Sequence, residues 1–212
     1  MIIHDRFIYV HIPKTGGSSI QSIIGDPIRW HALGHISIEK IYKNMKVKKQ
    51  ELPVICYVRN PYDRLISAYH YCYGLEEKFQ WPGLDMSAYQ RRLSPPIRRP
   101  PTVATFERFM QNVQEISSIC SPANLHLFKT QISFVSINNK LVVDHIYRFE
   151  NFKNDFNKMK KRFFIEGDLP HANKGPDRAL WQNFYRDKKV KEKVDELYRA
   201  DFEAFDYPME IR

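Results

Sequence analysis

A lysine, two glycines and two serines gather near the start of the chain, in the segment Pro13-Lys14-Thr15-Gly16-Gly17-Ser18-Ser19. Glycine lets the backbone approach a ligand closely, and lysine adds a mobile positive charge. Serines at the start of a helix leave backbone N–H groups at its positive dipole end. Together these groups suit a phosphate or a similar oxyanion. A strand-to-helix turn with a solvated lysine is the structural alternative.

A second polar segment has the sequence Arg59-Asn60-Pro61-Tyr62-Asp63-Arg64-Leu65-Ile66-Ser67-Ala68-Tyr69. An arginine fork suits a second phosphate, and Ser67 follows it about two helical turns later. Arg59 ends an apolar run, so we expect it at the same edge of a sheet as Lys14. Asp63 and Arg64 are interpreted as groups that stabilise the helix start or its neighbours.

Both polar segments follow apolar runs that read as buried strands. Residues 7–12 form the first run and residues 52–58 the second. We expect a helix over 18–24 after the first, and Pro61 starts a helix after the second. Strand, polar turn and helix thus occur twice, which predicts a parallel α/β sheet with ligands at the carboxyl ends of its strands.

The remaining segments continue this alternation with one interruption. Further predicted elements are a helix after Ser37, a helix over 105–116, a strand over 141–149, a helix over 152–164 and a mainly helical segment over 177–205. Residues 74–101 are rich in proline, arginine and aromatic residues, and we interpret them as an irregular insertion, either an acceptor-binding lid or a plain surface loop. With no internal repeat, we expect one domain over 1–212.

Composition indicates a globular chain with an anionic partner. The chain has 212 residues, of which 43% are hydrophobic, and its formal net charge is +9. A basic balance favours a nucleotide, a nucleic acid, an acidic glycan or a membrane surface as partner. Ordinary solvated lysine and arginine would give the same excess.

The three cysteines, Cys56, Cys72 and Cys120, have no metal-site spacing, and their odd number argues against a complete disulfide framework. Cys56 is expected to be a buried thiol, and one disulfide is left open. No apolar run is long enough to span a bilayer. The first strand begins almost at the N-terminus, so we expect no signal peptide and a cytoplasmic location.

The two polar segments together resemble the motifs of sulfotransferases that use 3′-phosphoadenosine 5′-phosphosulfate (PAPS). The two motifs are most similar to those of the carbohydrate branch, which includes the heparan sulfate 2-O-sulfotransferases and their bacterial relatives. The resemblance extends more loosely over residues 34–37, 126–150, 169–174 and 201–207. It implies a P-loop-like central parallel sheet flanked by helices in a single domain.

The resemblance also implies roles for single residues. The 5′-phosphosulfate loop would comprise Lys14, Thr15, Gly16, Gly17, Ser18 and Ser19. Arg59 and Ser67 would bind the 3′-phosphate, and Lys174 would be a contact from a late cofactor-binding loop. In the pair Gly34-His35, the histidine would be the catalytic base.

Sulfuryl transfer asks for such groups on chemical grounds. The protein positions the reactants and stabilises charge, and Lys14 can do so at the oxygen of the leaving phosphate. An acceptor hydroxyl needs a base near neutrality, which histidine supplies. His31 is the second candidate after His35, whereas His11 is interpreted as a core histidine. Glu39 could act as base or orient His35, with an exposed helix glutamate as the alternative. The mechanism requires no metal.

Gln131 and Ser133 lie in a segment that could touch acceptor or cofactor, with core packing as the alternative. The sequence therefore predicts a sulfotransferase that uses PAPS, releases 3′-phosphoadenosine 5′-phosphate (PAP) and sulfates a hydroxyl acceptor, expected to be a glycan rather than a nucleic acid. Two alternatives are a P-loop nucleotide-dependent kinase, for which the Walker A order is missing, and a non-catalytic polyanion-binding protein. The acceptor and the oligomeric state are left open.

Overall fold

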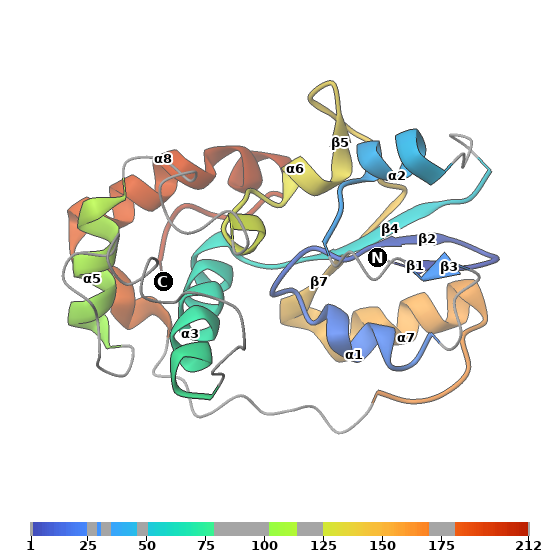
Figure 1. Ribbon diagram of the computed structural model, residues 1–212, viewed down its shortest axis with the longest axis horizontal. Coiled ribbons are helices and arrows are strands. Elements are labelled where there is room, and N and C mark those ends of the chain that lie inside the picture. Colours follow the sequence, from blue (N-terminus) through green and yellow to red (C-terminus); the bar gives the residue numbers. More distant parts are fainter. Residues whose placement is uncertain are drawn as a thin grey trace. The chain divides into compact units, whose positions relative to one another are not determined.

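The structure is a computed structural model that describes residues 2–24, 29–30, 35–45, 51–78, 102–113, 125–169 and 181–211 (Figure 1). It separates into two compact units, each assembled from segments that are far apart in the sequence. The sheet unit comprises Met1–Asn60, Thr130–Asp177 and Ala200–Tyr207. The helical unit comprises Pro61–Lys129, Arg178–Arg199 and Pro208–Arg212.

The sheet unit contains a five-stranded sheet in the order β3-β1-β2-β4-β7. Its strands are β1 (Ile2–Ile3), β2 (Ile8–Val10), β3 (Arg29–Trp30), β4 (Val54–Val58) and β7 (His145–Arg148). Strands β2, β4 and β7 are parallel to one another, whereas β1 is antiparallel to both of its neighbours. The predicted α/β fold with parallel strands and flanking helices is confirmed, and the antiparallel pair at one edge is an addition to it.

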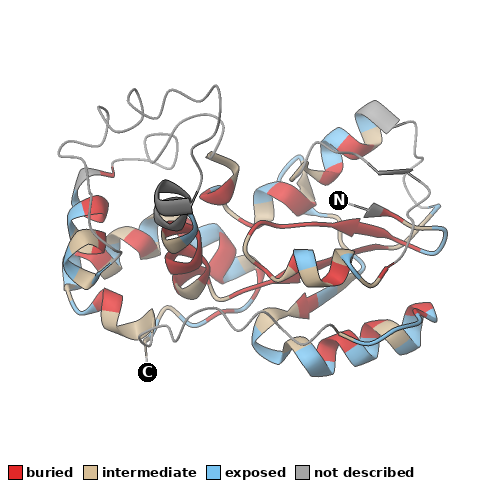
Figure 2. Cartoon of the chain, turned by 60° about the horizontal axis from the view of Figure 1, so that its bottom comes forward, coloured by how far each residue is buried: buried red, intermediate tan, exposed pale blue. Residues whose placement is uncertain are grey.

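Strands β2 and β4 are buried along their whole length, as Figure 2 shows. Burial of both faces explains why each strand is a continuous apolar run in the sequence. Val10 pairs with Cys56, and Val58 pairs with Arg148 on the next strand. The chain therefore leaves β2 and β4 at the same edge of the sheet.

Helices cover both faces of this sheet (Figure 1). On one face lie α1 (Gly17–Gln21) and α7 (Phe152–Phe163), and on the other lie α2 (Ile38–Met45) and α6 (Ile132–Val135). Tyr9 and Tyr57 lie in a core cluster with Ile20 of α1 and Phe156 of α7. Next to α6 is a small hairpin of β5 (Ser136–Ile137) and β6 (Lys140–Leu141).

The helical unit is built around aromatic side chains. Its elements are α3 (Pro61–Lys78), α5 (Val103–Asn112), η2 (Leu125–Leu127), η4 (Trp181–Tyr185) and the part of α8 (Lys188–Ala204) that precedes residue 200. Phe106 of α5 packs edge-on against Tyr69 of α3 and Phe184 of η4. The Tyr185 hydroxyl donates to the Tyr62 carbonyl at 2.8 Å, which fixes η4 to the start of α3.

Several predicted boundaries are wrong. Helix α3 begins at Pro61 as predicted but continues to Lys78, so residues 74–78 are helical and not part of an irregular insertion. Residues 79–101 lie outside the described part. The strand predicted over 141–149 divides into β6 and β7, because residues 142–144 leave the extended pairing. Among the described residues, no helix is long and apolar enough to cross a membrane.

Candidate active site

The loop from β2 to α1 turns by two residues with left-handed backbone. Lys14 has φ 67° and Gly16 has φ 84°, and Gly16 caps the start of α1. Thr15 is buried, and its hydroxyl donates to the Ile12 carbonyl at 2.8 Å. Ser18 is exposed on the first turn of α1, and the Ser19 N–H donates to the Gly16 carbonyl at 3.1 Å.

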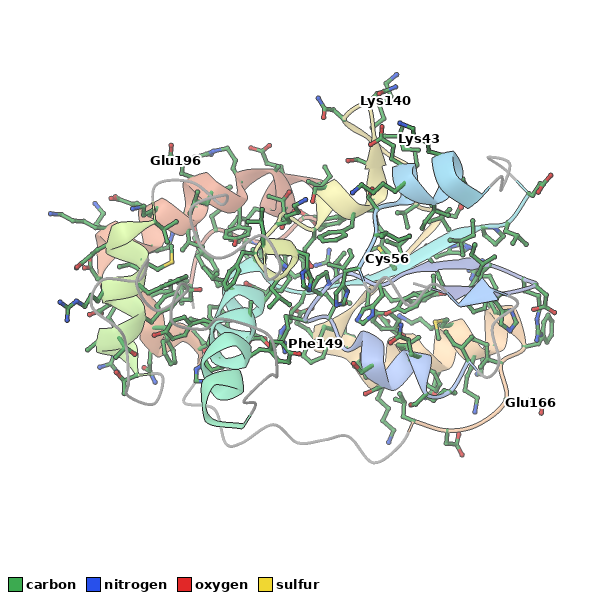
Figure 3. All side chains as sticks on the ribbon, in the orientation of Figure 1. Lys43, Cys56, Lys140, Phe149, Glu166 and Glu196 are labelled. Atoms are coloured by element: carbon green, nitrogen blue, oxygen red, sulfur yellow. The ribbon has the colours of Figure 1, made fainter. Side chains whose placement is uncertain are left out.

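Close packing explains both glycines of this loop. A Cβ atom on Gly17 would lie 1.9 Å from Cδ2 of His11, and one on Gly16 would lie 2.7 Å from the Phe152 ring. Phe149 also borders Gly16, and Figure 3 shows it beside the start of α1. The loop backbone therefore rests directly on aromatic rings, and no larger residue fits at either position.

Arg59, at the end of β4, contacts this loop. Its Nη1 atom donates to the Lys14 carbonyl oxygen at 3.1 Å, although the two residues are 45 positions apart. The guanidinium carbon lies 4.1 Å from the centroid of the Phe149 ring, a cation–π contact. Arg59 is only 5% exposed. Arg59 and Lys14 thus meet at one edge of the sheet, as predicted.

His35 lies against His11 at the start of the same loop. Its Nδ1 atom is 3.0 Å from the His11 carbonyl oxygen, and the two ring centroids are 4.3 Å apart. Because a carbonyl oxygen only accepts, Nδ1 carries the proton in the neutral ring and Nε2 has the lone pair. His11 is 8% exposed and packs against both Gly17 and His35.

For the other predicted site residues, membership of this group stays a prediction. Ser67 is 2% exposed in α3 of the helical unit, so its pairing with Arg59 stays a prediction. His31 and Lys174 lie outside the described residues. Glu39 is exposed on α2.

Gln131 is a residue whose role the sequence did not reveal. It is fully buried, and its side-chain amide bonds to the main chain of Arg59. The sequence offered only a polar residue near a predicted core segment, because a partner 72 positions away leaves no local pattern.

In the described part of the chain, no group of three or more His, Cys, Asp or Glu residues could hold a metal ion. Cys56 is a free, fully buried thiol on β4, as expected (Figure 3). Burial raises the pKa of this thiol well above its ordinary value.

Sequence comparison agrees with the motifs at the sheet edge. Residues 3–208 match the sulfotransferase family, a span that includes both polar segments. The chain belongs to the sulfotransferase family. No curated protein matches it. Sulfuryl transfer, the general reaction predicted from the two motifs, is thereby confirmed for this sulfotransferase.

Proposed function

We propose that the protein transfers a sulfuryl group from PAPS to a hydroxyl group of a carbohydrate, with His35 as general base. Family membership supports sulfuryl transfer in general. The observation that carries the choice of PAPS is the hydrogen bond from Arg59 to the Lys14 carbonyl, at 3.1 Å. It joins a 5′-phosphate-type loop to a second cationic group, the pair that a nucleotide phosphorylated at both positions requires.

The donor set fits such a nucleotide chemically. The loop offers backbone N–H groups from Gly16 to Ser18, and Lys14 and Arg59 add two positive charges. Phosphate oxygens accept from such groups, and an arginine fork matches them best. In this proposal Lys14, Thr15, Gly16, Gly17, Ser18 and Ser19 hold the 5′ end. Arg59 holds the 3′-phosphate with Ser67, and Lys174 is a further contact, both on the strength of the sequence motif.

PAPS supplies an activated sulfuryl group, and PAP is left after transfer. His35 takes the proton of the acceptor hydroxyl at Nε2 while that oxygen forms its bond to sulfur. Lys14 stabilises the negative charge left on the 5′-phosphate oxygen when its bond to sulfur breaks. The bond from Nδ1 of His35 to the His11 carbonyl supports this role, because it places the proton of the neutral ring on Nδ1 and the lone pair on Nε2.

A carbohydrate acceptor is favoured by the motif form and by the formal net charge of +9, which suits an acidic glycan. The experiment is a screen of glycans with labelled PAPS, comparing wild type with His35→Ala. We expect labelled glycan from the wild type and a loss of turnover of about 10²–10⁴-fold in the variant.

PAP affinity separates catalysis from binding in the same variants. His35→Ala should bind PAP as the wild type does. His145 lies on β7 outside the site, so the control variant His145→Ala should retain turnover. Full turnover in His35→Ala would exclude it as the base. If label passes only to acceptors without hydroxyl groups, the proposed reaction is wrong.

A further inference from the structure

Arg59 is held by its main chain as well as by its side chain. The Arg59 N–H donates to Oε1 of Gln131 at 2.9 Å, and Nε2 of Gln131 donates to the Arg59 carbonyl at 2.8 Å. One primary amide thus satisfies both backbone groups of Arg59, as a neighbouring strand would do. Only one orientation of the amide satisfies both bonds, since one partner donates and the other accepts.

Gln131 is in turn fixed by a buried carboxylate. The Gln131 N–H donates to Oδ2 of Asp201 at 2.8 Å, and the Ile132 N–H donates to Oδ1 at 2.9 Å. Asp201 and Gln131 are both fully buried. The carboxylate therefore satisfies N–H groups at the start of α6 and sets the direction of the Gln131 side chain.

The residue after Arg59 is held in a similar way. The Asn60 N–H donates to Oε1 of Glu150 at 2.6 Å, and the Tyr207 hydroxyl donates to Oε2 at 2.9 Å. Side chains from distant parts of the sequence thus accept hydrogen bonds from the two backbone N–H groups that follow β4. These bonds fix the backbone of Arg59. From this position its side chain reaches the Phe149 ring and the Lys14 carbonyl.

We propose that Gln131 and Asp201 are positioning residues that aim the Arg59 guanidinium at the 3′-phosphate of the nucleotide. This inference rests on the proposed function. Gln131 touches neither nucleotide nor acceptor and acts only through Arg59. A buried amide clamp suits this task because small displacements of a binding group reduce catalysis strongly.

Gln131→Glu is the sharpest test, because it changes one donor into an acceptor at nearly constant size. The new carboxylate oxygen faces the Arg59 carbonyl, so the clamp opens. We expect the dissociation constant for PAP, measured by calorimetry, to rise about tenfold or more. Gln111→Glu, an exposed change of the same charge on α5, should leave it unchanged.

A double-mutant cycle distinguishes positioning from general damage to the fold. In an Arg59→Met background, Gln131→Glu should have little further effect on PAP binding, because the group it positions is gone. An equal loss of affinity with and without the Arg59 guanidinium would overturn the proposal.

Asp201→Asn provides a second variant, which keeps the size of the side chain and one of its two acceptors. We expect it to weaken PAP binding less than Gln131→Glu, and again only when Arg59 is present. A wild type that does not bind PAP contradicts the proposed function. A wild type that binds PAP while both variants bind it equally well contradicts only the role of Gln131 and Asp201.

Discussion

At the scale of single residues, Gly17 has no room for any side-chain carbon. A Cβ atom there would overlap the His11 ring, which also contacts His35. We expect Gly17→Ala to lower the free energy of unfolding by about 1–3 kcal/mol, as overpacking does. Because the displaced ring borders His35, the rate of sulfuryl transfer should fall as well. Urea denaturation and the labelled-PAPS assay measure the two effects.

Gly167→Ala is the matched control for Gly17→Ala. Gly167 has φ 93°, so alanine is strained there too, but the nearest atom to its Cβ would be Ile23 Cγ2 at 3.5 Å. This variant should lose some stability and keep its rate of transfer. Equal rates in both glycine variants would show that the contact with His11 does not matter for the reaction.

Cys56 should be unreactive in the folded protein. It is fully buried on β4, and burial raises the pKa of its thiol, which disfavours the reactive thiolate. Iodoacetamide should therefore modify Cys56 only after denaturation, as read by mass spectrometry of the peptide that contains it. Rapid alkylation of this peptide in native protein would contradict the burial of β4.

At the scale of elements, the sequence predicted best the strands and helices with a regular pattern of apolar residues. Continuous apolar runs indicated β2 and β4, and helical spacing indicated α5 and α7. Strands β1 and β3 have two residues each, too few to give an alternating pattern. The hairpin of β5 and β6 was missed for the same reason.

The candidate site also has one part that could be predicted from the sequence and one part that could not. The meeting of Lys14 and Arg59 could be predicted because parallel strands bring their carboxyl ends to one edge. The clamp of Gln131 and Asp201 could not, since it joins segments about 70 positions apart through side-chain geometry. A pattern in the sequence marks residues near a strand end, whereas only the fold shows which distant side chain supports them.

Arg64 joins α3 to the segment of η2 and the residues that follow it. It is 1% exposed, and its guanidinium donates to the carbonyls of Leu127 and Lys129 within the helical unit. Arg64→Met leaves the buried Leu127 carbonyl and the partly buried Lys129 carbonyl without these donors, so we expect a loss of about 2 kcal/mol or more in the free energy of unfolding. Arg186→Met, at an exposed position, should stay within about 0.5 kcal/mol of wild type.

These two arginine variants are compared by urea denaturation. If Arg64→Met is as stable as Arg186→Met, the carbonyls of Leu127 and Lys129 do not depend on Arg64. If Arg64→Met also loses PAP binding while remaining folded, its interpretation as a purely structural residue is wrong.

At the scale of the whole molecule, the segment Ala200–Tyr207 completes the sheet unit. Phe202 and Phe205 are buried there, Asp201 accepts from the Gln131 N–H, and the Tyr207 hydroxyl donates to Glu150. Each buried phenylalanine contributes about 1.5–3 kcal/mol, and total stability is only about 5–15 kcal/mol. A chain that ends at Arg199 should therefore lose hydrogen-exchange protection in Val54–Val58.

A chain that ends at Glu210 is the control for this truncation, because it keeps all of these contacts. Its β4 amides should exchange as slowly as in the full chain. Equal protection in both shortened chains would mean that residues 200–207 are dispensable for the sheet unit.

Calorimetric titration with PAP tests the central claim most directly, because it requires both phosphate-binding groups and needs no knowledge of the acceptor. We predict that the wild type binds PAP and prefers it to ATP with magnesium. Arg59→Ala should weaken this binding strongly, whereas His35→Ala should not. A wild type that binds ATP with magnesium but not PAP would contradict the account.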